Sequence, residues 1–217
     1  PLCWALSRPR ASRRATLHPK RRRWFRRLAR QTYAYFEDFC GPSENSLPPD
    51  NVHLEDGRVA HRTSPTNIGL ALLAHLGARD LGHCGLHQLL ERVSGTVDTA
   101  NRLERHRGHF LNWYDTQTLE PLAPRYVSTV DSGNLVGHCR VLRQGLLELG
   151  DAPVWTSTLV DGLAETWELA EAALGATGSG RARTERDEIG AALAALAAAP
   201  DRASLERLAR LDRAVQT

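Results

Sequence analysis

The sequence predicts an all-α protein, and three observations support this prediction. Apolar residues recur at every third or fourth position along seven segments, which is the spacing of helices with one buried face. No stretch shows a convincing alternation of β-branched residues, and residues 126–130 are too few to build a sheet around. With 41% hydrophobic residues in 217, the chain is able to bury a core.

Seven helices are expected, and local signals mark several of their ends. They cover about residues 19–39, 65–82, 86–107, 132–149, 154–174, 184–199 and 203–215. Gly41 and Pro42 end the first helix, while Ser64 as N-cap and Pro65 at the first helical position begin the second. The first helix carries apolar residues such as Trp24 on one face and arginines on the other. The second is apolar nearly all round, so we expect it to be an inner, buried helix.

The connections between these helices alternate in length. Residues 40–64 and 108–131 form long loops, whereas 82–85 and 150–153 form short turns. Helices joined by short turns run antiparallel, so both long loops are expected at the same end of the helical layer. Loops at one end of a rigid scaffold are where binding and catalytic groups collect.

Charge is distributed unevenly along the chain. Up to Arg30 there are 11 basic residues and no acidic one, and the remainder carries 17 basic and 25 acidic side chains. Such a head occurs in nucleic-acid arms and membrane-surface anchors, but more often it is a solvated linker before a charged helix face, which is the interpretation we favour. The head lacks the interleaved aromatics of single-strand binders and the apolar region of a secretory signal. No apolar run approaches the roughly 18 residues of a membrane-spanning helix.

The spacing of the cysteines and the absence of methionine indicate the state of the thiols and the origin of the chain. Cys3, Cys40, Cys84 and Cys139 are widely spaced and include no C-x-x-C pair. We therefore expect free thiols in a reducing compartment and no metal site. Because the chain contains no methionine, we expect it to be a processed product or an internal piece of a longer protein.

The two long loops hold the residues that are candidates for binding a ligand. The second loop mixes aromatic rings with Asn, Asp, Arg, Ser and His, as a planar polar ligand with an apolar face requires. A sugar ring is such a ligand, because its C–H face lies on Trp or Tyr while its hydroxyls need hydrogen-bonding partners. The candidate substrate-binding residues are Asp50, Asn51, His61, Arg62, Asn67, His109, Asn112, Trp113, Tyr114, Arg125, Tyr126, Ser132 and Asn134.

Each of these residues also has a structural interpretation. Trp113 and Tyr114 are aromatic enough to close the end of the helical layer as core residues. Asp131 with the following serine fits an N-cap of the fourth helix, and Asp115 fits a turn. His61 and its neighbouring arginine fit a bridge to acidic loop groups, and His109 fits a hydrogen-bonded loop histidine. The sequence alone leaves both interpretations open.

At these loops the sequence resembles the middle domain of the large NdvB-type cyclic β-1,2-glucan synthases of bacteria. The resemblance runs from about residue 22 to 173, and its most specific strings are HRTSPTNIG at 61–69 and RYVSTVDSGNL at 125–135. Further matches are residues 27–36, LPPDN at 47–51 and GHFLNWYD at 108–115. One position departs from the family pattern, since Ser46 stands where the family has tryptophan.

The resemblance implies a fold and an activity. The family's middle domain is an (α/α)6 barrel that cuts a linear β-1,2-glucan and joins it to its own end by transglycosylation. Twelve barrel helices need about 340 residues at the spacing seen here, so we expect residues 19–175 to be the first half of a barrel. Residues 1–18 then form a basic linker and residues 176–217 a helical tail.

The catalytic expectations follow from the same resemblance. A retaining transglycosylase needs two carboxylates about 5–5.5 Å apart, and the resemblance implies that the main pair lies beyond Thr217. Within this chain Asp131 and Asp115 are the candidate catalytic helpers, and Glu44 and Asp50 are further carboxylates on the loop face. Carboxylate chemistry on acetals needs no cofactor, so none is expected.

The expected partners are the β-1,2-glucan and the other domains of a membrane-anchored parent on the cytoplasmic side of the bacterial inner membrane. We expect no nucleic acid and no membrane contact by this segment itself. An endo-β-1,2-glucanase-like hydrolase or a sugar-binding module is the alternative, and a basic-armed nucleic-acid binder is a more remote one.

Overall fold

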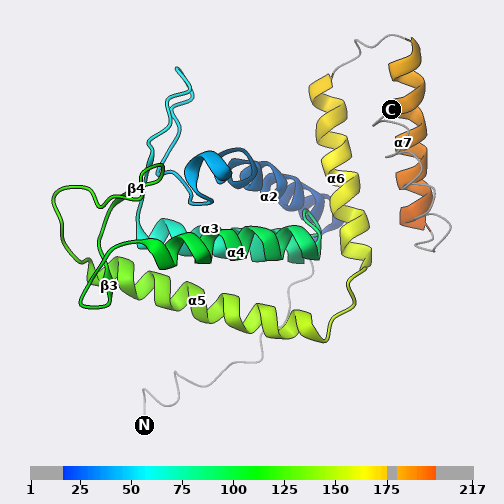
Figure 1. Ribbon diagram of the computed structural model, residues 1–217. Coiled ribbons are helices and arrows are strands. Elements are labelled where there is room, and N and C mark those ends of the chain that lie inside the picture. The colour runs from blue at the N-terminus through cyan, green and yellow to red at the C-terminus, as the bar shows by residue number, and fades with distance from the viewer. Residues whose placement is uncertain (1–16, 175–179, 199–217) are drawn as a thin grey trace.

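Helices make up most of the structure, a computed structural model that describes residues 17–174 and 180–198 (Figure 1). Its α-helices are α2 (Pro19–Phe39), α3 (Pro65–Asp80), α4 (Leu86–Arg102), α5 (Thr129–Gly150), α6 (Ser157–Leu174) and α7 (Gly180–Ala198). The all-α prediction is therefore confirmed. The helix expected at 203–215 and most of the basic head lie outside the described residues.

Helices α2 to α5 run in alternating directions, with α3 packed against the other three (Figure 1). The loop before α3 and the loop before α5 consequently lie at the same end, on the left of Figure 1. Two short strands join these loops there, because β1 (Arg62–Thr63) pairs antiparallel with β4 (Tyr114–Asp115). The prediction that both long loops share one end of an antiparallel set of helices is confirmed.

The core follows α3, as its apolar sequence predicts. The fully buried apolar residues of this helix include Ile68, Ala71 and Leu72. Two glycines let α3 and α5 approach closely. A Cβ at Gly69 would lie 2.3 Å from His138 Nδ1, and one at Gly145 would lie 2.5 Å from a methyl carbon of Leu76. Close packing of α3 against α5 holds the beginnings of both helices next to the two loops.

The third expected helix ends earlier than predicted. Helix α4 stops at Arg102, and residues up to 107 were wrongly assigned to it. They begin a hairpin in which β2 (Arg105–His106) pairs with β3 (His109–Phe110). The helix ends where Leu103 takes an extended backbone with ψ of 137°, and Arg107 and Gly108, with φ angles of 50° and 85°, form the tight turn of the hairpin. Helices α5, α6 and α7 also begin at residues other than those expected.

Helix α5 begins at Thr129, three residues before the expected start, and this changes the N-cap. The Ser128 hydroxyl accepts a hydrogen bond from the Asp131 N–H at 3.1 Å, so Ser128 is the N-cap and neither Asp131 nor Ser132 is. Asp131 instead lies in the first turn of α5. Helices α6 and α7 begin at Ser157 and Gly180, where about 154 and 184 were expected.

Helix α6 is held against the turn between α3 and α4. Gly82, with a φ of 79°, has no room for a side chain, since a Cβ would lie 1.8 Å from a backbone oxygen of α6. A Cβ at Gly162 of α6 would in turn lie 2.0 Å from the Gly82 carbonyl oxygen. A buried ion pair between Arg26 and Glu165 adds to this contact, and His83 Nε2 lies 3.0 Å from Glu165 Oε2.

The first helix buries a face that the periodicity did not predict. Tyr33 and Arg26 are its buried residues, because Arg26 reaches Glu165 of α6. Trp24 is 59% exposed although the expected apolar face includes it. The assignment of arginines to one face and apolar residues to the other is therefore wrong for the first half of α2.

Candidate functional site

A buried carboxylate joins the two long loops beside the β1–β4 pair. Arg62 lies opposite Asp115 in that pair. Glu44, which is 5% exposed, accepts a hydrogen bond from the Thr116 hydroxyl and lies 2.8 Å from His61 Nδ1. His61 therefore bridges to an acidic loop group, as its structural interpretation predicts. The contact fixes the end of the first loop against the second.

Asp50 gathers side chains from the first loop and from the start of α3. Its Oδ2 accepts hydrogen bonds from Arg62 Nη2 at 2.9 Å and from Asn51 Nδ2 at 3.0 Å. Its Oδ1 accepts one from Asn67 Nδ2 at 3.3 Å. A carboxylate with several donors, one of them charged, is held in one orientation. Asp50 thus positions the Arg62 guanidinium.

Asn112 holds several side chains of the second loop in place, as Asp50 does in the first loop. Asn112 is 5% exposed. In the amide orientation that suits its neighbours, Nδ2 donates to Asp131 Oδ2 at 2.9 Å. Its Oδ1 then accepts from the Tyr126 hydroxyl at 2.8 Å and from Trp113 Nε1 at 2.6 Å. The reverse orientation would place the amide oxygen against a carboxylate and the NH2 group against two donors. The Asn112 amide therefore fixes the orientation of the Trp113 and Tyr126 rings and of the Asp131 carboxylate.

A cation–π contact joins these two clusters. The Arg62 guanidinium carbon lies 4.8 Å from the centroid of the Trp113 ring. Arginine over a tryptophan face is a favourable arrangement. Because Arg62 also donates to Asp50, it connects the aromatic ring of the second loop to the carboxylate of the first.

Asp131 is held as a carboxylate by hydroxyl groups. Burial acts to raise the pKa of Asp131, but the hydroxyls of Ser128, Thr66 and Ser64 and the Thr66 N–H outweigh it. The resulting pKa lies below the ordinary value of an aspartate. The position in the first turn of α5 also favours a negative charge. Asp131 is therefore ionised at neutral pH and offers hydrogen-bond acceptors, not a proton.

These contacts form a connected series of side chains at the shared end of the helices. Asn134 of α5 adds to it by donating to Thr66 Oγ1 at 3.1 Å. We call the set the loop network. Its members are Asp50, Arg62, Thr66, Asn67, Asn112, Trp113, Tyr126, Asp131 and Asn134. Seven of the predicted substrate-binding residues and one predicted catalytic residue thus come together.

Two predicted residues have structural positions instead. Tyr114 is fully buried, and its hydroxyl accepts from the Leu111 N–H at 2.7 Å and donates to the Glu104 carbonyl at 2.6 Å. Its assignment to substrate binding is corrected to a core role. Asp115 Oδ1 accepts from the N–H groups of residues 117 and 118 at 2.9 and 2.8 Å, which makes Asp115 a turn residue. Although burial acts to raise the pKa of Asp115, these hydrogen bonds lower it overall.

The remaining predicted residues lie at the rim of this end. Arg125 forms an exposed ion pair with Glu104, and His109 is exposed in β3. Within residues 17–174 neither side chain is hydrogen-bonded to the loop network. Ser132 donates back to the Ser128 carbonyl at 2.8 Å inside the first turn of α5. The Asn51 side chain contacts the loop network at Asp50, and the His61 side chain contacts Glu44, which lies outside the network.

Sequence reasoning missed the hydroxyl groups that support Asp131. Ser64 was assigned only as the N-cap of α3, a role it has, since its Oγ accepts from the Asn67 N–H at 3.2 Å. Both Ser64 and Thr66 lie within the HRTSPTNIG string, which was the available signal. Asn45 was also missed, and its Nδ2 donates to the Thr116 carbonyl at 2.9 Å across the two loops.

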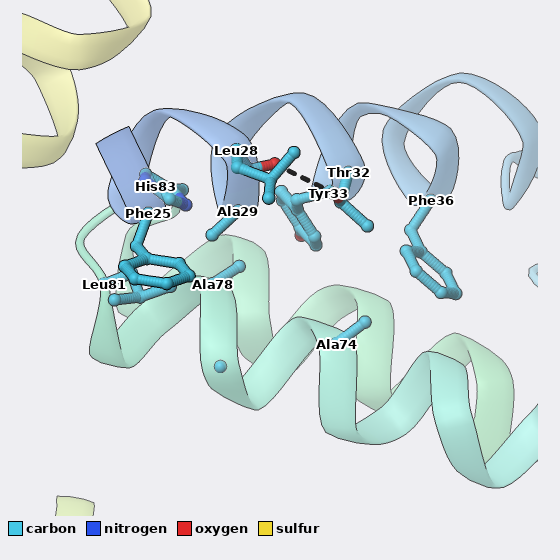
Figure 2. A pocket seen from close by; sticks show the side chains of 11 residues that line it. Phe25, Leu28, Ala29, Thr32, Tyr33, Phe36, Ala74, Ala78, Leu81 and His83 are labelled. Atoms are coloured by element: carbon cyan, nitrogen blue, oxygen red, sulfur yellow. Dashed lines mark hydrogen bonds between the residues drawn. The ribbon is translucent and has the colours of Figure 1, made fainter. Parts of the chain in front are cut away.

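An apolar groove lies away from the loop network, between α2 and α3 (Figure 2). It has a volume of about 400 Å³. Phe25, Leu28 and Phe36 form one wall, and Ala74 and Ala78 form the other. No group of three or more His, Cys, Asp or Glu residues in the described ranges is arranged to hold a metal ion. The three described cysteines are free thiols.

Comparison with known proteins supports a relationship to one protein. No family model matches the chain. A stretch of 129 residues, 59% of the chain, is 46% identical to the cyclic β-(1,2)-glucan synthase NdvB of Rhizobium meliloti (strain 1021). This stretch covers 5% of that protein's length. Among the described helices, none is both long and apolar enough to cross a membrane. The chain therefore contains a region related to a small part of a cyclic glucan synthase.

Proposed function

We propose that this chain is a region of a cyclic β-1,2-glucan synthase and that its loop network binds the linear β-1,2-glucan before ring closure. The observation that carries the proposal is the position of Trp113. Its partly exposed ring is held by Arg62 on one side and by the Asn112 amide at its Nε1. An aromatic face surrounded by fixed donors and acceptors suits a glucose unit, whose C–H face stacks while its hydroxyls pair.

The polar residues of the network would supply those pairs. Arg62 is a donor, Asp131 is an acceptor without a proton, and Asn134 is exposed beside them. Their orientation is set before a ligand arrives, because each is bonded to another member. Preorganised groups lose little conformational freedom on binding, which favours affinity. The 46% identity to a protein named for β-(1,2)-glucan synthesis supports this choice of sugar.

We propose further that residues 19–175 are the first half of an (α/α)6 barrel in the middle domain of the synthase. The alternating helices and the loops gathered at one end support such a barrel. Ring closure would proceed by transglycosylation, with two carboxylates of the remaining half of the barrel as nucleophile and acid/base. Asp131 would then contact the glucan without donating a proton, while Asp115 maintains a turn. The parent would be membrane-anchored, with this region on the cytoplasmic side.

Calorimetric titration of the 217-residue chain with linear β-1,2-glucan tests the binding. Trp113→Ala is expected to weaken binding by about 1–3 kcal/mol, roughly 5- to 150-fold, because a stacked sugar loses its aromatic face. Asp131→Asn should also weaken binding, and because it removes the carboxylate that accepts from Thr66 and Asn112, it should lower the melting temperature as well. Trp155→Ala is the matched control, as Trp155 is 39% exposed and lies outside the loop network. Equal affinities of wild type and Trp113→Ala would refute the proposal.

A product assay separates ring closure from hydrolysis. The 217-residue chain is expected to form neither rings nor new reducing ends from β-1,2-glucan, because the main catalytic pair lies outside it. The complete parent protein should form rings. Reducing ends without rings from the parent would instead assign the site to an endo-β-1,2-glucanase.

A further inference from the structure

The first half of α2 carries an exposed apolar surface. Trp24, Phe25 and Leu28 are 59%, 49% and 43% exposed. The rings of Trp24 and Phe25 meet edge to face with their centroids 4.9 Å apart. Large apolar side chains that gather on a surface in this way mark sites of interaction. Glucan binding does not account for them, because the loop network lies at the other end of α2.

Basic side chains surround this surface. Lys20, Arg21, Arg22 and Arg27 are exposed, and none of them is paired with a carboxylate within the described residues. Arg21 precedes Phe25 by four positions and lies on the same side of α2 one turn earlier. Arg22 instead lies toward α6, in a hollow lined also by Asp161 and Glu168. The first turn contains no acidic residue. Positive charge therefore adjoins the apolar surface directly.

The groove between α2 and α3 opens beside the same residues. Phe25 and Leu28 line it from α2 (Figure 2), and its volume is about 400 Å³. The opposite wall is formed by small and aliphatic side chains such as Ala74, Ala78 and Leu81. On the α2 wall the Thr32 hydroxyl donates to the Leu28 carbonyl at 2.9 Å, and the Tyr33 hydroxyl lies 3.2 Å from His75 Nδ1, so both polar groups have partners. The groove is thus apolar with a basic border.

We propose that this face of α2 docks on an anionic lipid bilayer. Trp24, Phe25 and Leu28 enter the interfacial region, and the groove takes part of an acyl chain. The exposed lysine and arginines contact the phosphate groups. A helix with exposed aromatic and aliphatic residues among arginines is suited to lie in the plane of such a surface. A nucleic acid would account for the charge but not for the exposed aliphatic residues or the groove.

The proposal departs from our expectation that this segment makes no membrane contact. The sequence offered no apolar run of the roughly 18 residues that span a bilayer, and docking on a bilayer surface does not require one. The exposed apolar side chains of α2 suit the acyl interior of a bilayer, and the unpaired positive charges beside them suit its anionic headgroups. Each arginine near an anionic bilayer contributes about 1 kcal/mol, or roughly fivefold in partition.

Flotation of the 217-residue chain with lipid vesicles tests the proposal. Vesicles of phosphatidylcholine and phosphatidylglycerol in equal amounts should bind at least about tenfold more protein than phosphatidylcholine alone. The double variant Arg21→Glu with Arg27→Glu should lose at least about tenfold in binding, since both side chains are exposed. Phe25→Ser with Leu28→Ser should lose a similar factor, because less apolar surface enters the interface.

Matched variants on α5 are the controls. Arg140→Glu with Arg143→Glu makes the same charge change on exposed residues, and Val141→Ser removes an apolar side chain that is 55% exposed. These variants should keep wild-type binding, and melting temperatures confirm that every variant is folded. Quenching of Trp24 by brominated lipid reports its depth and should disappear in Trp24→Phe. Equal binding to neutral and anionic vesicles, equal losses in the α5 controls, or binding of duplex DNA but not vesicles would overturn the proposal.

Discussion

Replacing Asn112 by aspartate tests whether the loop network holds Asp131 as the structure indicates. The variant keeps the size of the side chain and removes the NH2 group that donates to Asp131 Oδ2 at 2.9 Å. A second carboxylate then stands at hydrogen-bond distance from the first. The site is 95% enclosed at this residue, since Asn112 is 5% exposed, so water screens the two charges poorly.

The expected magnitude follows from the lost hydrogen bond and the new repulsion. A hydrogen bond to a charged group contributes about 1.5–3 kcal/mol. Two adjacent carboxylates share one proton over a wide pH range, because full ionisation of both is unfavourable. The upper pKa of the pair in the folded variant is therefore raised. We expect a loss of about 2–3 kcal/mol in the free energy of unfolding at pH 8.

The sign of the pH dependence separates the variant from the wild type. In the wild type the pKa of Asp131 is lowered, so its stabilisation is present above the unfolded pKa of about 3.9 and is lost as pH falls. In Asn112→Asp the raised pKa gives stabilisation that is present at acidic pH and is lost as pH rises. The difference between the two proteins should therefore grow from pH 5 to pH 8.

Urea unfolding followed by circular dichroism between pH 5 and pH 8 measures this difference. Asn101→Asp is the control, because Asn101 is exposed and its Oδ1 faces Arg105. The control should follow the wild-type curve. A difference between Asn112→Asp and wild type that does not change with pH would refute the arrangement of Asn112 against Asp131.

Three further changes test the core. Tyr114→Phe leaves a buried N–H and a part-buried carbonyl without the Tyr114 hydroxyl, so it should cost about 1–3 kcal/mol in urea unfolding and leave glucan affinity unchanged. Burial lowers the pKa of His75 to about 4, so stability should fall by about 3 kcal/mol as pH falls from 6.5 to 4, and His75→Gln should remove most of this dependence. Gly162→Ala places a Cβ 2.0 Å from the Gly82 oxygen, so it should lower the melting temperature.

Much of the fold was predictable because it depends on local chemistry. The start of α3 followed from Ser64 and Pro65, whose cap and fixed φ are properties of single residues. The shared end of the loops followed from the lengths of the connections. The end of α4 did not, because apolar residues such as Leu103 continue the helical spacing into the hairpin. There the extended backbone at Leu103 ends the helix, and the left-handed backbone at Arg107 and Gly108 turns the chain into the hairpin.

The face of α2 was not predictable, since periodicity does not show which face a neighbouring helix covers. Arg26 is buried because Glu165, 139 residues later, supplies a partner. A charge is buried only where such a partner exists. The exposure of Trp24 follows from the same rotation of the helix. A prediction from spacing alone places the apolar residues inward and therefore fails here.

The sequence predicted which residues belong to the site, but it did not predict the contacts between them. Residues such as Asp50, Arg62 and Trp113 were chosen because their types suit a sugar. Their contacts depend on the register of the β1–β4 pair, which sequence does not reveal. Tyr114 shows the limit most clearly. It neighbours Trp113, but alternate residues of a strand point to opposite sides, and Tyr114 points into the core.

The division of the site into buried and exposed residues determines how it would bind a ligand. Glu44 and Asn112 are nearly enclosed and hold the two loops and the Trp113 ring in place. Arg62 is about half exposed and is free to exchange one of its contacts for a ligand hydroxyl. A ligand therefore meets a surface whose backbone is already ordered, and it replaces side-chain contacts only at the outer edge. Because the ordering cost is met in folding, affinity should depend on Arg62 and Trp113, while loss of Glu44 should act mainly through stability.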